Sequence, residues 1–486
     1  MRPRRAASIV ALRRRAHGRR RRTLLAAGVA VAVVAASACG DEPVAPEPLP
    51  TIADVRLAQN DFNVLSGYAT ASVRGADSVA VLYHLDDAAN TPDSITPAVR
   101  PVGDTVTVPI LGMRPGRRYA VRVIAYHGAD TTFGEPREFI TGQLPADIPR
   151  FDASGIDPSP GLVLLGAGRY VVVIDNAGEV VWYRRFPGGV GLNVMAQPTG
   201  RYVLRPPTAK ADDVEPWLEL DAMGYVRRQL HCAGDLPSRP HDIVLEENGS
   251  YLLLCDEVRT MDLSAHGGST AARVTATAVQ RIGPTGALRF HWSAFDHFAI
   301  TDLPARERSG PAVNWTHGNA IDVDADGNFV VSFRNLGEVA KIDARTGDVL
   351  WRLGGVRNEF TFVGTDAPAF ARQHSARIGK GGTVVLLDNL GDPAESRAEH
   401  YVLDERNRVA RLIRSYGSRP RVVTEIGGSV QPLAHGRTLV SFGTAGRVEE
   451  YDAAGNTVWR IEGNPGYVFR AQRIRSLYAP GVGTAR

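Results

Sequence analysis

The sequence predicts an all-β protein: a six-bladed β-propeller preceded by a small β-sandwich. Short segments rich in Val, Ile, Phe and Leu alternate with turn residues through most of the 486-residue chain, which is typical of strands. A unit of four such segments recurs in residues 151–486. Four-stranded units repeated at this length indicate the blades of a propeller.

The clearest unit covers Thr316–Gly355, where turns at Asp326-Gly327 and Gly347 separate apolar segments. The four predicted strands are Asn319–Val323, Phe329–Phe333, Glu338–Ile342 and Val349–Leu353. Asp-Gly turns between apolar segments indicate an antiparallel meander. Such a sheet has two faces to cover, so we expect it to stack on copies of itself.

The copies share a turn glycine followed by an apolar strand. These glycines are Gly168, Gly200, Gly249, Gly327, Gly382 and Gly436. Four residues past a second turn, an aromatic residue recurs at Trp182, Phe290, Trp351 and Trp459. The spacing between copies is uneven, which places insertions in loops. Six copies predict six blades.

Residues 1–38 contain ten arginines, no acidic residue and an apolar run from Leu24 to Ala36. This pattern predicts an export signal, too short to argue strongly for a spanning helix. The run ends at Ala36-Ser37-Ala38-Cys39, which resembles the lipobox of bacterial lipoproteins and implies acylation of Cys39. We expect a lipid-anchored cell-envelope protein facing the periplasm or the exterior. The alternative is ordinary cleavage that releases a soluble secreted protein, and the arginine pairs also suit the twin-arginine route.

Without this leader the basic residues fall to 46 against 52 acidic ones, a net charge near −6. The basic character therefore belongs to the leader and does not indicate nucleic-acid binding. Membrane contact is expected through the lipid anchor only.

Residues 39–50 are acidic and proline-rich, which predicts a disordered tether. Residues 51–143 predict short strands, and the segment Leu111–Val123 resembles the tyrosine-corner region of fibronectin type III domains, with Tyr119 as the corner residue. We expect an immunoglobulin- or fibronectin III-like sandwich acting as a spacer or a homodimer contact. Residues 144–150 form the linker to the propeller at 151–486.

Cys232 and Cys255 remain once Cys39 is assigned to lipid. In an oxidising compartment they can pair. Two unpaired, partly buried thiols fit the sequence equally well.

Three histidines stand where the first strand of a predicted blade begins: His241, His317 and His374. First strands line the channel of a propeller, so these imidazoles are expected to converge at one mouth of it. Arg334, at the end of the next strand of the fourth blade, can point the same way. Three imidazoles suit zinc, but a fixed guanidinium repels a second cation. The set fits a tetrahedral oxyanion better; three structural loop histidines are the remaining alternative.

These residues resemble the bacterial arylsulfotransferase family, which transfers sulfuryl groups without a nucleotide donor. The motifs that carry the resemblance are His241-Asp242, His317 with Asn319, Arg334-Asn335, Gln373-His374-Ser375, Leu387-Asp388-Asn389 and the closing segment Arg470–Tyr478. The resemblance implies that His374, His241, His317 and Arg334 are catalytic. It also implies that Asn319, Asn335 and Asn389 bind substrate.

By this resemblance His374 attacks the sulfur of a phenolic sulfate ester and forms a sulfohistidine, and a second phenol then accepts the sulfuryl group. Arg334 and His317 hold the sulfuryl oxygens, and His241 moves the phenol proton. The expected partners are a phenolic donor and a phenolic acceptor, with no cofactor and no metal.

Two other functions fit the same pattern: a non-catalytic propeller that binds a ligand or partner at the cell envelope, and a metal-dependent hydrolase. The segment Asp322–Gly327 imitates the start of an EF-hand loop, but the twelfth position is Phe333 instead of glutamate. A hairpin turn explains it better.

Overall fold

The computed structural model describes residues 48–86, 93–207, 215–365, 370–391, 394–462 and 466–478. The predicted leader and Cys39 lie outside these residues. The chain divides into two compact units, Met1–Pro48 and Leu49–Arg486, and the strands all belong to the second unit. No helix among the described residues has the length and hydrophobicity needed to cross a bilayer.

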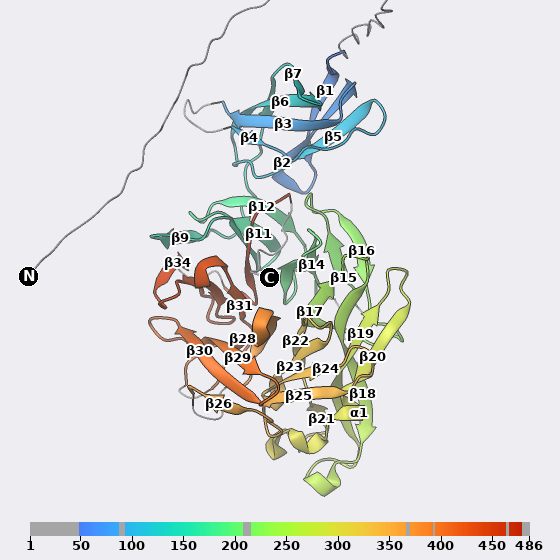
Figure 1. Cartoon of the computed structure of the whole chain (residues 1–486), viewed down its shortest axis with the longest axis vertical. Helices are drawn as coiled ribbons and strands as arrows, with labels where there is room; N and C mark the ends of the chain where they lie inside the picture. Colours follow the sequence, from blue (N-terminus) through green and yellow to red (C-terminus); the bar gives the residue numbers. More distant parts are fainter. Residues whose placement is uncertain are drawn as a thin grey trace, which may run out of the picture. The chain divides into compact units, whose positions relative to one another are not determined.

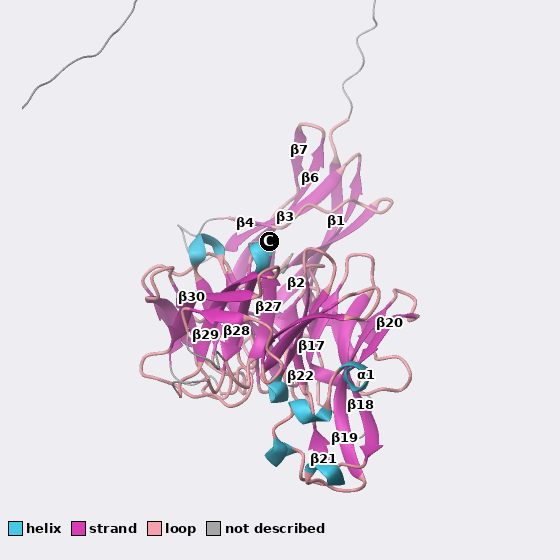
Figure 2. Cartoon of the chain, turned by 60° about the horizontal axis from the view of Figure 1, so that its bottom comes forward, coloured by secondary structure: helices cyan, strands magenta, loops and turns pink. Residues whose placement is uncertain are grey.

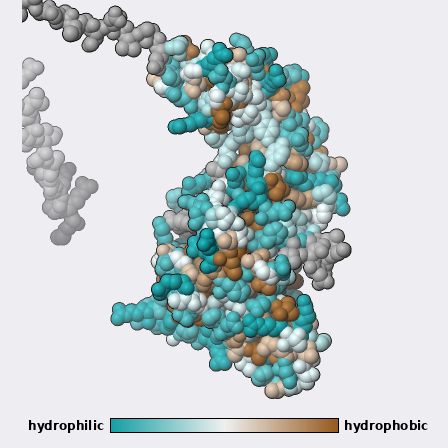
Figure 3. All heavy atoms as spheres, turned by 90° about the vertical axis from the view of Figure 1, so that its right-hand side faces the viewer, coloured by the Kyte–Doolittle hydropathy of each residue, from teal (hydrophilic) through white to brown (hydrophobic). Residues whose placement is uncertain are grey.

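The described chain is nearly all β, as predicted. Its one α-helix, α1 (Ala294–His297), has four residues, and the other helical segments are 3-10 turns of three residues. Figure 2 shows these helical pieces as short segments among strands. On the face drawn in Figure 3, hydrophobic residues form small groups among hydrophilic ones, because the apolar side of most strands is buried between sheets.

Residues 51–140 form two sheets around one core (Figure 1). The first sheet has the order β1 (Thr51–Asn60), β2 (Asn63–Arg74), β5 (Thr105–Ile110). The second has the order β4 (Ser94–Ile95), β3 (Ser78–Leu85), β6 (Arg118–His127), β7 (Asp130–Phe133), with β8 (Arg137–Ile140) also paired to β6. The Tyr119 hydroxyl accepts a 2.7 Å hydrogen bond from the Arg114 backbone N–H.

The rest of the described chain forms six mainly antiparallel sheets, each built mainly from consecutive strands. The first contains β10 (Leu162–Ala167), β11 (Tyr170–Ile174) and β12 (Val180–Arg185). The second contains β13 (Val194–Ala196), β14 (Tyr202–Leu204), β15 (Trp217–Leu220) and β16 (Val226–Leu230). The third contains β17 (Ser238–Leu245), β18 (Tyr251–Met261), β19 (Ala272–Ile282) and β20 (Leu288–Ser293), with β21 (Ala312–Asn314) beside β19.

The fourth sheet contains β22 (Gly318–Val323), β23 (Phe329–Phe333), β24 (Glu338–Ile342) and β25 (Val349–Gly354). The fifth contains β27 (His374–Gly379), β28 (Thr383–Asp388), β29 (Arg397–Asp404) and β30 (Val409–Gly417), with β26 (Thr361–Val363) at its outer edge. The sixth contains β31 (Ser429–Pro432), β32 (Thr438–Ser441), β33 (Val448–Tyr451) and β34 (Thr457–Glu462).

The first and last strands of the six-sheet region, β9 (Asp152–Gly155) and β35 (Ala471–Ile474), complete the sixth and first sheets. β35 pairs with β10, with Leu164 opposite Gln472. β9 pairs with β34, with Ser154 opposite Arg460. Both pairings join segments about 300 residues apart, so the two ends of the six-sheet region hold its first and last sheets together.

Hydrophobic clusters lie between consecutive sheets all the way round. In the described part of the chain, six clusters join the first sheet to the second, the second to the third, and so on until the sixth joins the first. Each sheet thus buries both faces against its neighbours, as a repeated meander requires. Trp182, Trp351 and Trp459, the recurring aromatic residues, are fully buried in these clusters.

The four strands predicted in Thr316–Gly355 are confirmed as β22–β25, to within one residue at each end. In the segment Asp322–Gly327, which imitates the start of an EF-hand loop, two carboxylates bind the ammonium group of Lys341. Its Nζ lies 2.6 Å from Asp324 and 2.8 Å from Asp326. The segment turns as a hairpin, with the Gly327 N–H donating to the Asp324 carbonyl at 2.9 Å.

Candidate active site

The three predicted histidines lie on neighbouring inner strands. His241 belongs to β17, His317 directly precedes β22, and His374 is the first residue of β27. β22 contacts both β17 and β27, so three residues that are far apart in sequence meet. His241 and His374 are buried, and His317 is half-buried.

His241 and His317 face each other through their Nε2 atoms, 3.3 Å apart. Their rings meet edge to face, with centroids 4.9 Å apart. On the far side, the Asn314 amide Nδ2 lies 2.7 Å from His317 Nδ1. When that amide donates to Nδ1, the His317 Nε2 proton points at His241 Nε2. His317 has φ of 51°, a left-handed conformation that is uncommon for a side-chain-bearing residue and is often found at functional sites.

His374 is held by its Nδ1 atom, which lies 2.8 Å from Asn389 Oδ1 and 3.1 Å from the Arg372 carbonyl. The Asn389 amide is oriented because its Nδ2 donates to the carbonyls of Thr424 and Gly427. Both partners of Nδ1 are therefore acceptors, so Nδ1 carries the proton. Nε2 keeps its lone pair and receives a long 3.3 Å contact from the Gly427 N–H.

Two guanidinium groups meet at Asn335. Arg334 donates to Asn335 Oδ1 at 3.0 Å and Arg372 donates to the same oxygen at 2.8 Å. The other nitrogen of Arg334 reaches the Glu425 carbonyl, and Arg372 forms an ion pair with Glu307. Arg334 was predicted from the sequence, and Arg372 joins it. The comparison of the repeats missed Arg372 because this residue lies before β27, the strand that begins with His374.

The histidines are neutral near pH 7. Burial is the main cause of their lowered pKa values, and nearby arginines are the second. Together they lower the pKa of His317 to about 2 and keep the pKa of His241 well below its usual value. Burial likewise lowers the pKa of His374 to about 4. The site therefore combines uncharged imidazoles with fixed positive guanidinium groups, which favours a bound anion.

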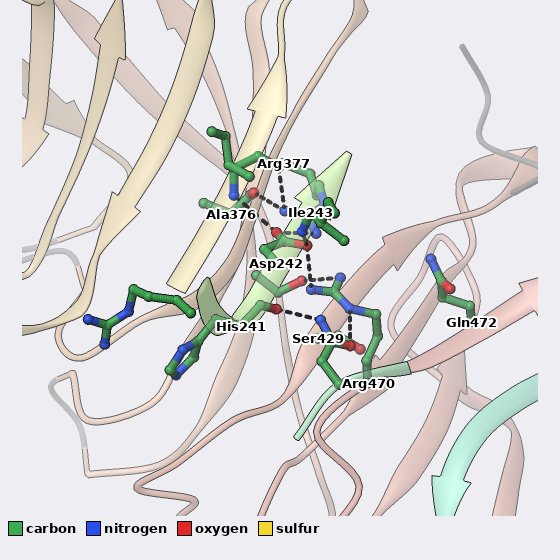
Figure 4. A network of polar contacts seen from close by, with 12 residues as sticks. His241, Asp242, Ile243, Ala376, Arg377, Ser429, Arg470 and Gln472 are labelled. Atoms are coloured by element: carbon green, nitrogen blue, oxygen red, sulfur yellow. Dashed lines mark hydrogen bonds and ion pairs between the residues drawn. The ribbon is translucent and has the colours of Figure 1, made fainter. Parts of the chain in front are cut away.

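A buried polar network connects the strands of His241 and His374. Figure 4 shows Asp242, next to His241, between the guanidinium groups of Arg377 and Arg470. Arg377 pairs with Asp242 at 2.7 Å, and Arg470 donates to the Ser375 hydroxyl at 3.0 Å. Burial, followed by the charge of Arg377, lowers the pKa of Arg470 to about 9. The network fixes the residues that neighbour both imidazoles.

The segment before β35 adds two aromatic rings that the sequence reasoning missed. The Phe469 ring lies 5.9 Å from the ring of His241 and 6.0 Å from that of His374, centroid to centroid. The Tyr467 ring lies 6.4 Å from that of Phe469. A signal was present, since Phe469 lies just before β35, as His317 lies just before β22, but β35 pairs with the first sheet and was not recognised as part of the repeat.

Two of the three predicted asparagines lie beside His374, and the third joins the two arginines. Asn319 donates from Nδ2 to the Gln373 carbonyl at 2.7 Å, beside His374. Asn335 joins the two arginines, and Asn389 contacts His374 itself. In the described residues, no group of three or more His, Cys, Asp or Glu is arranged to hold a metal ion.

A disulfide lies in the same sheet as His241. Cys232 and Cys255 are bonded, with Cα atoms 6.2 Å apart, so the pairing that the sequence left open is made. Cys255 lies opposite Ser238 in the β17–β18 ladder, three residues from His241. The bond therefore braces the strand that carries this imidazole.

The chain shares low identity with solved structures. A protein of unknown function from Bacteroides caccae is 14% identical over 65% of this chain and 100% of its own, with a TM-score of 0.43. A virginiamycin B lyase from Staphylococcus aureus with quinupristin is 10% identical over 63% and 87%, with a TM-score of 0.35. A structure from Bacteroides thetaiotaomicron is 13% identical over 85% and 98%, with a TM-score of 0.33. Likenesses at this level carry no conclusion about function.

No curated protein matches the chain significantly. The sequence profile described as arylsulfotransferase (ASST) matches residues 237–464. This range contains His241, His317, Arg334 and His374. The segment that carries the histidine cluster therefore matches the arylsulfotransferase family.

Proposed function

We propose that the protein is a nucleotide-independent aryl-sulfate sulfotransferase that works through a sulfohistidine at His374. The observation that carries this proposal is the tautomer of His374: two acceptors hold its Nδ1 proton and leave the Nε2 lone pair for attack. Its lowered pKa keeps the imidazole unprotonated at neutral pH. A neutral, oriented imidazole next to guanidinium groups is suited to nucleophilic attack on a sulfuryl group.

In the first half-reaction, Nε2 of His374 forms a bond to sulfur while the bond between sulfur and the aryl oxygen breaks. The bonding pair leaves with the oxygen as a phenolate, which takes up a proton from solvent to leave as the phenol; the proton that an imidazole accepts in the second half-reaction returns to solvent. The Nδ1 proton stays shared with Asn389 and the Arg372 carbonyl, and both acceptors stabilise the positive charge on the substituted imidazole. Arg334 and His317 hold the sulfuryl oxygens, whose negative charge is spread in a loose transition state.

In the second half-reaction, a phenol takes the place of the product. Its oxygen attacks sulfur, the N–S bond breaks, and the electron pair returns to Nε2 of His374. The phenol proton passes to an imidazole, a role we assign to His241 because it lies against both His317 and Phe469. The negative sulfuryl group offsets the nearby arginines and so makes that imidazole a better base than in the free site. Two half-reactions at one histidine give ping-pong kinetics.

The architecture supports this proposal through the cyclic contacts of the six sheets. We propose that they are the blades of a six-bladed β-propeller, with residues 144–150 as linker. We also propose that residues 51–143 form a fibronectin III-like sandwich, in which Tyr119 is the corner residue. Export and acylation of Cys39, which give a lipid-anchored envelope enzyme, and a homodimer contact through the sandwich belong to the same proposal.

The test uses the full chain, 4-nitrophenyl sulfate and phenol, in the presence of a chelator. We expect nitrophenol release that depends on added phenol, together with phenyl sulfate as product. After incubation with donor alone, tryptic digestion at neutral pH should give the peptide Gln373–Arg377 carrying one sulfuryl group. His374→Ala should abolish both signals. Release that is independent of phenol and lost with chelator would indicate a metal-dependent hydrolase instead, and an intact pocket without release or adduct would indicate a binding propeller.

A further inference from the structure

A cavity of about 380 Å³ opens beside the histidine cluster. It lies where β10 ends and β13 and β35 begin, and its wall includes Val190, Leu192, Val194, Tyr467 and Phe469. Four of these five side chains are apolar or aromatic hydrocarbon, and Tyr467 is 37% exposed at the surface. Pockets for small molecules are mostly apolar with a few polar groups and measure about 300–1,000 Å³. The cavity has the lining and the size of such a pocket.

Phe469 is the wall that the cavity shares with the histidines. Its ring lies edge-on to His241 and His374, with centroid distances of 5.9 and 6.0 Å. Gly427 fills the same corner: its N–H contacts His374 Nε2, and a Cβ there would lie 2.6 Å from the Tyr467 hydroxyl oxygen. Phe469 therefore borders both the cavity and the imidazole of His374.

We propose that this cavity binds the aromatic body of the substrate, and that it selects phenols and phenolic sulfates of two or three rings. The inference rests on the sulfotransferase function proposed above and adds the substrate class. The aromatic ring of the substrate would pack against Phe469, since aromatic pairs prefer offset or edge-to-face contacts. The hydroxyl or sulfate would then project past Phe469 towards His374 and the arginines.

The volume of the cavity is the reason for proposing substrates with two or three rings. A volume of about 380 Å³ exceeds what a single substituted ring fills, and unfilled apolar space forfeits the contacts that give affinity. A naphthol or a hydroxybiphenyl would occupy it more completely. Added apolar surface in such a pocket changes specificity by about 10–200-fold for each small group.

Leu192 offers the sharpest test because it lines the cavity and is only half-buried. Leu192→Trp reduces the cavity and Leu192→Ala enlarges it, both at a position outside the tightly packed core. We compare kcat/KM for 2-naphthyl sulfate with kcat/KM for 4-nitrophenyl sulfate. The ratio should favour the two-ring donor in the wild-type protein and should fall about tenfold in Leu192→Trp. Leu350→Trp, in β25 away from the cavity, is the matched control and should keep the wild-type ratio.

These measurements distinguish failure of the cavity assignment from failure of the proposed function. If the wild-type protein transfers sulfate but Leu192→Trp leaves the ratio unchanged, the cavity assignment is wrong while the proposed function stands. If the wild-type protein transfers no sulfate, the proposed function fails. The cavity is then judged by fluorescence titration of 2-naphthyl sulfate into His374→Ala. Saturable binding weakened by Leu192→Trp but not by Leu350→Trp supports the cavity, and equal binding by both variants refutes it.

Discussion

Asn389 accepts the Nδ1–H of His374 at 2.8 Å, and two backbone carbonyls hold the Asn389 amide in the orientation that makes this possible. The pair thereby settles which nitrogen of His374 is free. Asn389, for which the family resemblance implied substrate binding, contacts His374, the proposed nucleophile. We therefore assign it as a positioning residue within the proposed mechanism.

Asn389→Ala should slow formation of the sulfohistidine about 100-fold, because the imidazole loses a partner that fixes its tautomer and angle, and small misplacements at a reacting atom have effects of this size. Single-turnover release of nitrophenol measures this step. Asn456→Ala removes an amide that contacts Asp452 on an exposed turn and serves as the control. An unchanged burst rate in Asn389→Ala would contradict the positioning role.

The rate of the nitrophenol burst should depend on pH through the protonation of His374. Burial lowers the pKa of this imidazole to about 4, so Nε2 stays unprotonated and nucleophilic down to that pH. We expect a burst rate that is nearly constant from pH 8 to 5 and halves near pH 4, whereas an unperturbed histidine would give a midpoint near 6.5.

The lowered pKa of His374 also affects the free energy of unfolding. The unfolded chain takes up this proton below its pKa of about 6.5, while the folded chain does not until about pH 4. This group therefore lowers the free energy of unfolding as the pH falls from 6.5 to 4. Circular dichroism at each pH separates loss of fold from loss of the nucleophile, and a midpoint near 6.5 in folded protein would contradict the prediction.

The two arginines at Asn335 should differ in effect. Arg334→Gln removes the guanidinium that the mechanism places on the sulfuryl oxygens and should lower kcat about 10²–10³-fold. Arg372→Gln keeps the backbone carbonyl that holds His374 but removes a second positive charge, so we expect a smaller loss of about tenfold in kcat/KM. Arg345→Gln, on an exposed turn, is the control. Equal losses at Arg334 and Arg345 would argue against an anion site.

The disulfide between Cys232 and Cys255 should stabilise the protein and support activity. It closes a loop with a sequence separation of 23 residues, for which chain entropy predicts about 3 kcal/mol of stabilisation. Replacing both cysteines by alanine should lower the free energy of urea unfolding by about this amount. It should also lower kcat, since the bond braces the strand of His241. The wild-type protein with and without reductant provides the matched comparison, and equal stability in the two states would count against this role.

The local pattern of the sequence determined much of the fold. β22–β25 were predicted closely because apolar segments and Asp-Gly turns act over a few residues. The repeat then identified His241, His317 and His374 as equivalent positions, and the structure brings them to adjoining inner strands.

Tertiary structure alone decided which groups complete the site. The Arg372 side chain reaches Asn335, and Phe469 reaches His374, from segments that the comparison of the repeats did not align with the histidines. The pairings of β9 with β34 and of β35 with β10 depend on strands about 300 residues apart. The Cys232–Cys255 bond became clear only once Cys255 lay beside the start of β17. Strand propensity and turn chemistry are set by near neighbours, whereas contacts between distant segments depend on how all the sheets pack together.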